Sequence, residues 1–371
     1  MSNILVVAGH FGDDPHPSGY ANKLFQGIQN FFKTEKSSSF TFYNGGSWDL
    51  VFGIMGHIKE YDIIFWFPDV SNDKPLKLVE DIKANNPRAI LITSKNNVGE
   101  KYTTLHLIAR ALKVKSNLLV EFTRDEKGMI LATILDPLGN AFAYKEADVK
   151  RVSFALFSRV MALTKFTRSQ SVRIDGDQKI DIEVPDKPEF FDIVKKKAAI
   201  FHELIYAVNQ DRFLGNVSFR CPHGFPSFRN GDWVFVSRRN IDKTGIDRSG
   251  FVPVLTSFGA LYNHTVEYVG AHKPSVDTPI QVALYGTYTS VNFMLHSHTY
   301  IEGAPFTKSV IPCGAMEEFE EIRELVPGWD TPDFCINLKG HGSIVFASDV
   351  DYISKVTYYA RKFPELACSG M

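Results

Sequence analysis

The sequence predicts a protein of two α/β domains, the first built on a mostly parallel sheet. Three observations predict it. The chain has 371 residues, apolar segments of strand length alternate with amphipathic segments through its first third, and a charged segment with prolines interrupts this pattern near the middle. A chain of this length exceeds what one hydrophobic core usually organises. We place a first domain at residues 1–171, a linker at 172–190 and a second domain at 191–371.

The first domain is predicted from residues 4 to about 125, where buried strands alternate with amphipathic helices. Such alternation is typical of right-handed βαβ crossovers and of a parallel sheet covered on both faces. We expect a Rossmann-like or flavodoxin-like domain. The segments are ILVVA, SGYANKLFQGIQNFF, FTFY, YDIIFWF, PLKLVEDIKA, AILITS, TTLHLIARAL and NLLVEF, followed by the strands MILATIL and NAFAY and the helix VKRVSFALFSRVMALTKF.

A linker or short ribbon is expected at 172–190, because this segment is charged, carries Pro185 and Pro188 and lacks helical periodicity. The helix FFDIVKKKAAIFHELIYAV then opens the second domain. Glycines, acids and histidines surround the end of the first strand, where ligands of open α/β sheets bind. The candidates for metal ligands or proton-transfer groups or, alternatively, for a hydrated loop are His10, Asp13, Asp14 and His16. Ser18 with Gly19 suits a phosphate at the following helix start. The end of another strand would line the same crevice with Thr93, Ser94 and Lys95.

Composition excludes several classes of partner. Lys plus Arg number 41 and Asp plus Glu number 42, so no global field attracts nucleic acid or an anionic membrane. No apolar stretch reaches the ~18 residues of a membrane span, and the apolar run at residues 4–8 is too short for a signal-peptide core. Four cysteines without CxxC spacing suggest no disulfide framework, so we expect a cytoplasmic protein; they are Cys221, Cys313, Cys335 and Cys368.

Three histidines carry the chemistry of the second domain. His296 and His298 share one parity in TSVNFMLHSHTY, so a β-strand projects both from the same face. His341 stands between Gly340 and Gly342, which permit a tight turn and close backbone approach. Three protein ligands leave one coordination position of zinc open, which is the catalytic arrangement. The alternative for the pair is two polar residues on a solvated strand face.

An aspartate precedes a predicted helix start in KPSVDTPIQVALY. Thr278 caps the helix, Pro279 occupies the first turn and Gln281 completes a capping box. Asp277 is then held rigidly enough to act on a nearby site. The alternative is an acid that only complements the helix dipole.

These ordered motifs resemble the class II aldolase/adducin family over roughly residues 196–365. GNVS matches the family motif near the substrate phosphate, and DWVFVSRRNIDKTGI matches a strand and turn that usually end in TPSG. KPSVD matches a segment that in the family usually reads KPSSE. HSH and GHG match the segments that carry the family's metal ligands. The resemblance implies an α/β/α domain with a mainly antiparallel sheet. It also implies a homo-oligomer, for example a tetramer.

The same resemblance implies a zinc-dependent aldolase-type lyase. Zinc, or another divalent transition metal, would bind His296, His298 and His341 and stabilise an enediolate as a carbon–carbon bond in a small phosphorylated or anionic hydroxy-carbonyl substrate breaks or forms. Asp277 would shuttle the proton. The residues expected to hold the anionic end are Gly215, Asn216, Ser237, Arg239 and Ser275.

The sequence also departs from the family pattern. Asp277 is one methylene shorter than the usual glutamate, and SRRN at 237–240 places two guanidinium groups where the family has TPSG. Arginine forks suit a larger or differently shaped anion, unless they face solvent. Three alternatives stay open: an epimerase or dehydratase on the same metal site, a bifunctional enzyme whose first domain binds a nucleotide or other small molecule, and a non-catalytic adducin-like assembly protein. Retention of all three histidines speaks against the last.

Overall fold

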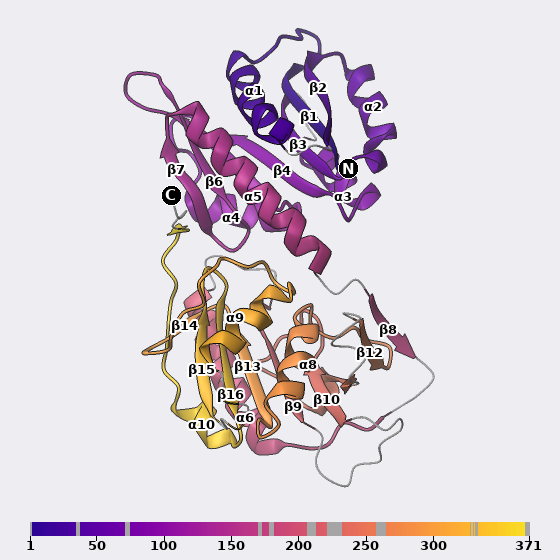
Figure 1. Ribbon diagram of the computed structural model, residues 1–371, viewed down its shortest axis with the longest axis vertical. Coiled ribbons are helices and arrows are strands. Elements are labelled where there is room, and N and C mark those ends of the chain that lie inside the picture. Colours follow the sequence, from indigo (N-terminus) through magenta and orange to yellow (C-terminus); the bar gives the residue numbers. More distant parts are fainter. Residues whose placement is uncertain are drawn as a thin grey trace. The chain divides into compact units, whose positions relative to one another are not determined.

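The computed structural model divides the chain into two compact units (Figure 1). The first comprises Met1–Thr164 with Phe363–Met371, and the second Lys165–Lys362. The residues that the structure describes are 2–34, 38–70, 75–169, 173–177, 182–205, 213–220, 232–256, 265–326, 328, 330 and 333–367. Cys221 and Cys368 lie outside them.

These boundaries differ from the expected 1–171, 172–190 and 191–371 at two places. Strand β18 (Glu365–Leu366) pairs with β7 (Asn140–Glu146), so the C-terminal segment belongs to the first unit's sheet. Strand β8 (Arg173–Asp177) pairs with β12 (Thr265–Val269) inside the second unit's sheet, within the segment expected as a linker or ribbon. In both places backbone hydrogen bonding to a sheet decides the assignment.

The first unit contains an eight-stranded sheet in the order β18-β7-β6-β5-β4-β3-β1-β2. Strands β2, β1, β3, β4 and β5 are parallel, whereas β6 is antiparallel to both β5 and β7. The predicted parallel-rich, Rossmann-like sheet is thus confirmed. Its remaining strands are β1 (Ser2–Phe11), β2 (Ser38–Gly46), β3 (Ile63–Val70), β4 (Ile90–Asn96), β5 (Leu118–Arg124) and β6 (Ile130–Leu135).

Helices cover both faces of this sheet because its central strands are apolar on both sides. In β1, Ile4 and Val6 pack with helices α1 and α5, whereas Leu5 and Val7 pack with α2 and α3. Such continuous apolar strands are typical of parallel sheets. The helices of this unit are α1 (Gly19–Thr34), α2 (Trp48–Gly56), the short 3-10 helix η1 (Ile58–Glu60), α3 (Pro75–Asn85), α4 (Thr104–Lys113) and α5 (Val149–Ser169).

The second unit contains an eight-stranded sheet in the order β15-β16-β13-β9-β10-β11-β12-β8. All neighbours are antiparallel except β12 and β8, which confirms the mainly antiparallel sheet. A separate two-stranded sheet joins β14 and β17. The strands not yet given are β9 (Asn216–Arg220), β10 (Asp232–Ser237), β11 (Phe251–Thr256), β13 (Phe293–Ser297), β14 (Tyr300–Ile301), β15 (Phe334–Leu338), β16 (Gly342–Ala347) and β17 (Tyr358–Tyr359).

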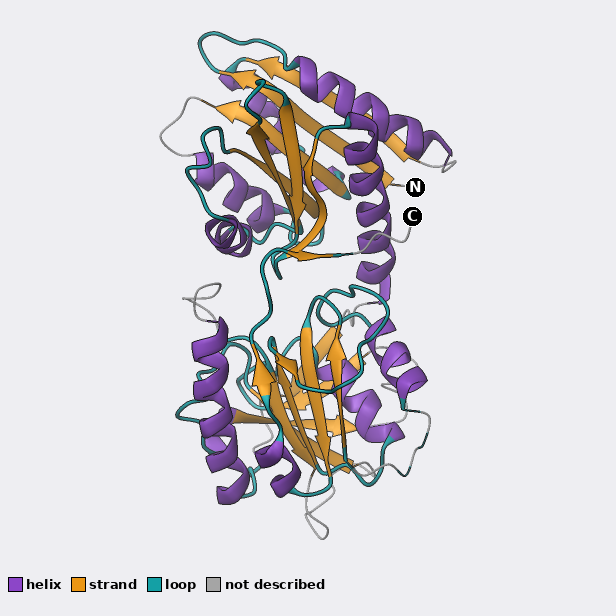
Figure 2. Ribbon diagram, turned by 90° about the vertical axis from the view of Figure 1, so that its left-hand side faces the viewer, coloured by secondary structure: helices purple, strands orange, loops and turns teal. Residues whose placement is uncertain are grey.

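This sheet is the middle layer of an α/β/α sandwich (Figure 2). One face packs with α8 (Thr278–Thr287) and α9 (Glu317–Leu325), the other with α6 (Pro188–Ile205) and α10 (Val350–Lys355). The short 3-10 helix η3 (Arg248–Gly250) precedes β11. Strand alternation in β13 places Met294 in the core with α8 and α9 and Leu295 in the opposite core. None of the described helices combines the length and apolar character that crossing a bilayer requires.

Candidate metal centre

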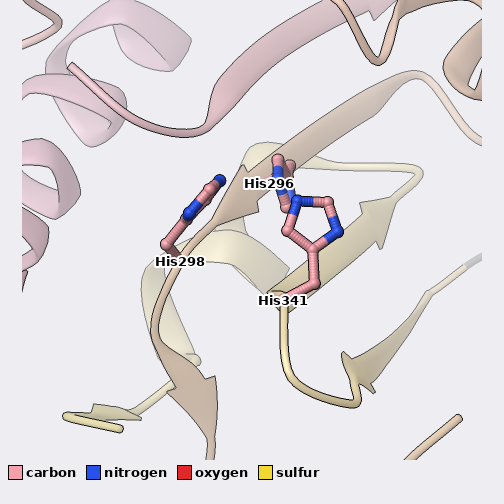
Figure 3. Close-up of side chains that lie close together, drawn as sticks. All are labelled: His296, His298 and His341. Atoms are coloured by element: carbon pink, nitrogen blue, oxygen red, sulfur yellow. The ribbon is translucent and has the colours of Figure 1, made fainter. Parts of the chain in front are cut away.

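The three predicted histidines meet in the second unit (Figure 3). His296 lies on β13, between β9 and β16; His298 follows the end of that strand, and His341 occupies the turn between β15 and β16. Their ring centroids are 4.7 Å (His296–His341), 4.9 Å (His298–His341) and 5.2 Å (His296–His298) apart. One nitrogen from each ring lies within 4.8 Å of the other two. All three side chains are buried.

Two glycines bring His341 to this position, as its sequence setting predicts. Gly340 has a φ of +70°, in the left-handed region that glycine adopts readily. A Cβ on Gly342 would overlap the carbonyl oxygen of Ser297. The β15–β16 turn therefore packs its backbone directly on the HSH segment, which no larger residue at 342 allows without a shift.

Hydrogen bonds turn two ring nitrogens toward a common point. His296 Nδ1 lies 2.9 Å from the carbonyl oxygen of Ser343, and His341 Nδ1 lies 2.7 Å from Glu318 Oε1. Because a carbonyl only accepts, His296 Nδ1 donates and its Nε2 offers a lone pair to the site. That Nε2 is buried without a hydrogen-bond partner. An unsatisfied buried polar atom is costly, and a metal ion would satisfy it.

The surrounding atoms also fit a divalent transition metal. Asp277 Oδ2 lies 3.9 Å from His296 Nε2, and Cys313 Sγ lies 3.1 Å from His341 Nε2. Asp277 Oδ1 is buried without a partner, like His296 Nε2. Imidazole, thiolate and carboxylate are the ligands that zinc takes in proteins. A ring nitrogen that donates to a carboxylate, as His341 does to Glu318, is typical of metal-bound histidine.

Electrostatics separate His341 from the other two histidines. Burial, reinforced by the charge of His341, holds the pKa of His296 and that of His298 well below their usual value. Burial alone would also lower the pKa of His341, but Cys313 and Glu318 raise it well above the usual value. Two rings are therefore neutral and ready to bind a cation, whereas a metal ion must displace a proton from His341.

The predicted capping box at α8 is wrong. The N-cap residue is Asp277 and its side chain makes no capping bond; Thr278 is already helical and its hydroxyl donates to the carbonyl of Ser275 (2.6 Å). The amide of Gln281 donates to Asn216 instead of to the helix start. The Asp277 side chain therefore makes no bond to the helix start and lies beside His296 instead. Burial raises its pKa.

The residues expected to bind the anionic end of a substrate differ in position. Asn216 Nδ2 donates to Ser275 Oγ (3.1 Å) and Asp277 Oδ2 (3.2 Å) in the buried site. Ser237 Oγ accepts from the backbone of Val217 (3.2 Å). Burial raises the pKa of Asp277, and the charge of the exposed Arg239 only partly offsets that rise.

Gly215, the fifth of these residues, has a φ of +78°, and a Cβ there would overlap the carbonyl oxygen of His296. Glycine at 215 therefore lets the backbone before β9 approach the end of β13. Beside the histidines, a cavity of about 10 Å³ is lined by residues that include Asn216, Asp277 and His296. A space of this size holds about one water-sized group.

Sequence reasoning missed Cys313 and Glu318. Cys313 is one of four scattered cysteines, and Glu318 belongs to the acidic run EEFEE. One signal was available for Glu318: it lies four residues before Ile322, and both are buried on the same face of α9. A carboxylate on the apolar face of an amphipathic helix requires a partner.

A second and larger cavity, of about 550 Å³, lies in the first unit. It adjoins the carboxyl ends of β1, β3 and β4, as expected for an open α/β sheet. His10, His16, Ser18, Ser94 and Lys95 line it as the sequence suggested. Other lining residues form an aromatic wall and add cations; they are Tyr20, Phe67, Phe122, Arg110 and Arg124.

No family model matches the chain, and no curated protein is significantly similar to it. Solved structures of class II aldolase-superfamily proteins are similar to part of it, as its motifs predict. One is YgbL from Escherichia coli, called a putative aldolase/epimerase/decarboxylase (15% identity over 45% of this chain and 84% of that one, TM-score 0.33). Another is an L-fuculose 1-phosphate aldolase (14% identity, 43% and 79%, TM-score 0.30).

A flavoprotein of DNA and pantothenate metabolism from Streptococcus pneumoniae is also similar (10% identity over 44% of this chain and all of that one, TM-score 0.34). These identities and TM-scores are low.

Proposed function

We propose that the second unit is a metal-dependent aldolase-type lyase whose zinc, or similar divalent ion, binds His296, His298 and His341. The observation that carries this proposal is the buried Nε2 of His296, which has no partner and lies among the other two imidazoles. When bound, the ion would supply Lewis-acid stabilisation of the charge that develops on substrate oxygens as the carbon–carbon bond breaks.

The protein's own groups would transfer the proton and orient the substrate. Asp277 has a pKa raised by burial, and its Oδ1 is unpaired. A carboxyl group whose pKa is raised holds a proton more readily and can return it to a reacting atom. Asn216 fixes Oδ2 of Asp277 and thereby the direction of Oδ1.

The substrate would be a small anionic hydroxy-carbonyl compound, with phosphorylated compounds as the leading class. The positive charge of the exposed Arg239 favours the charged form of Asp277 and would also attract an anionic substrate. With Gly215, Asn216, Ser237 and Ser275 it would hold the anionic group. We propose a cytoplasmic homo-oligomer as the working form.

The test combines metal analysis with product analysis. Protein purified without chelators should contain one zinc-like ion for each chain and release an aldehyde from hydroxy-carbonyl phosphates. An epimerase would change stereochemistry without cleavage, and a dehydratase would release water and leave the carbon skeleton intact. Protein with no bound metal and no affinity for added zinc would contradict the proposal and favour a non-catalytic assembly role.

A second candidate function concerns the first unit, which would bind a small anionic molecule such as a nucleotide. The 550 Å³ cavity supports it, because its volume suits a small ligand and Lys95, Arg110 and Arg124 line it against a single acid, Asp69. Calorimetry with inorganic phosphate and a nucleotide panel tests this function separately. Absence of binding by every compound would count against it.

A further inference from the structure

We propose that Cys313 is a fourth protein ligand of the metal, so that the resting centre is a three-histidine, one-thiolate site to which substrate would add as a fifth ligand. This inference rests on the proposed metal site and extends it. Its consequence is selectivity: a thiolate favours zinc or cobalt over magnesium or manganese, which prefer oxygen ligands.

The position of the Cys313 sulfur beside His341 is the first observation that supports this proposal. Cys313 Sγ lies 3.1 Å from His341 Nε2, the nitrogen that Glu318 leaves free at the other side of the ring. Cys313, His341 and Asp277 each offer a ligand atom within 4.8 Å of the other two. His341 also belongs to the group of three histidines. The thiol therefore lies beside His341, the ring that the two groups of ligand atoms share.

The backbone around Cys313 holds the sulfur there. Gly314 has a φ of +78°, and a Cβ on it would lie 3.1 Å from the carbonyl oxygen of Val276. Burial raises the pKa of Asp277, and the backbone of Gly314 partly offsets that rise. The turn carrying Cys313 thus lies close to the segment that carries Asp277.

A second observation indicates that these atoms surround a ligand. His296 is 3% exposed and Asp277 is 7% exposed, yet His296 Nε2 and Asp277 Oδ1 have no hydrogen-bond partner. A hydrogen bond between the Cys313 thiol and His341 satisfies neither atom. A cation between the imidazoles and the sulfur accounts for the unpaired nitrogen and the short sulfur–nitrogen separation together.

The ligation step involves no oxidation. The S–H bond of Cys313 breaks, its electron pair forms the bond to the metal, and the proton leaves to solvent. The proton on His341 Nε2 leaves in the same way. Zinc–nitrogen and zinc–sulfur bonds of about 2.0–2.1 and 2.3 Å separate the two ligand atoms by roughly 3.5 Å at a tetrahedral angle. The observed contact of 3.1 Å is about 0.4 Å shorter, so the two atoms would move slightly apart on binding one ion.

Cobalt(II) added to the metal-free full-length protein provides the test. Three histidines alone give visible ligand-field bands, whereas a cobalt–thiolate bond adds a near-ultraviolet charge-transfer band. We expect both in the unchanged protein, loss of the charge-transfer band in Cys313→Ser, and its retention in the control Cys335→Ser. Cys335, like Cys313, is partly buried.

The outcomes separate this inference from the proposed function. Visible bands without the charge-transfer band would overturn the role of Cys313 and leave the three-histidine site standing, as would a band that persists in Cys313→Ser. Absence of all cobalt bands would overturn both. Should Cys313→Ser fail to fold, X-ray absorption of the unchanged zinc-loaded protein decides: a sulfur shell at about 2.3 Å supports the proposal, and a shell of nitrogen and oxygen only contradicts it.

Discussion

The two units hold their polar groups in different ways. In the second unit the candidate ligands come from an interior strand and a hairpin turn of an antiparallel sheet, and all three histidines are at most 6% exposed. In the first unit the polar groups ring a cavity of about 550 Å³ at the carboxyl ends of parallel strands. The first arrangement fixes a few atoms around one point, as a metal requires, whereas the second leaves room for a whole small molecule.

The largest expected effect is loss of the metal. His296→Ala removes a ligand on a rigid strand, and we expect it to abolish stoichiometric zinc binding, as measured by elemental analysis after dialysis. His272→Ala changes an exposed histidine of the same unit and should retain zinc. Equal zinc content in the two variants would contradict the proposal that zinc binds at the buried histidines.

Asp277→Asn should retain zinc and lower turnover about 10²- to 10⁴-fold, because the amide cannot transfer the proton. The side chain keeps its size and its contact with Asn216. Steady-state kinetics on a cleaved substrate measure the effect. Asp277→Glu, which restores the length of the family's residue, should retain more activity than the amide. Unchanged turnover in Asp277→Asn would assign the proton transfer to another group.

Glu318→Gln should weaken zinc binding about 10- to 100-fold, because the carboxylate orients His341 and increases the basicity of its ring. Competition with a chromophoric chelator measures the affinity. Glu320→Gln, on the exposed side of α9, is the matched control. If both variants bind zinc equally well, the contact of Glu318 with His341 serves folding only.

Zinc affinity should also depend on pH. The pKa of His341 is raised, so this ring gains a proton as the pH falls through that value, and the proton competes with the metal. Affinity should therefore rise with pH up to this pKa and fall about tenfold for each unit below it. In Glu318→Gln the dependence should move to lower pH. A flat profile from acid to alkaline pH would contradict a ligand role for His341.

The smallest effect is expected in the first unit. Arg110→Ala should weaken binding of an anionic ligand about tenfold, because one charge-assisted hydrogen bond is lost. Arg88→Ala lies outside the cavity lining and should leave the affinity unchanged. Calorimetry with the best-binding compound measures both. An equal affinity in the two variants would show that the ligand does not use the cavity.

The sequence was sufficient for the layers of the fold and for the histidines. Continuous apolar strands with helices between them indicated the parallel sheet, and alternation in TSVNFMLHSHTY placed His296 correctly because a strand has a fixed period. The roles of Glu318 and Cys313 were not predicted, because these residues lie 23 and 28 positions from His341 in the sequence and contact it only through tertiary packing.

Predictions from local sequence patterns were wrong where a tertiary contact replaced the expected local one. Thr278 and Gln281 have the spacing of a capping box, but Gln281 reaches the buried Asn216 instead. Strand β18 was not predicted for a different reason, because two residues are too few to show a periodic pattern. Only its pairing with β7 makes it part of the first sheet.

Zinc-edge anomalous diffraction from crystals of the zinc-loaded protein would locate the metal itself. We expect one strong peak about 2.0–2.1 Å from a ring nitrogen of each of His296, His298 and His341. Zinc bound at another place, with these three rings left without a metal, would contradict it.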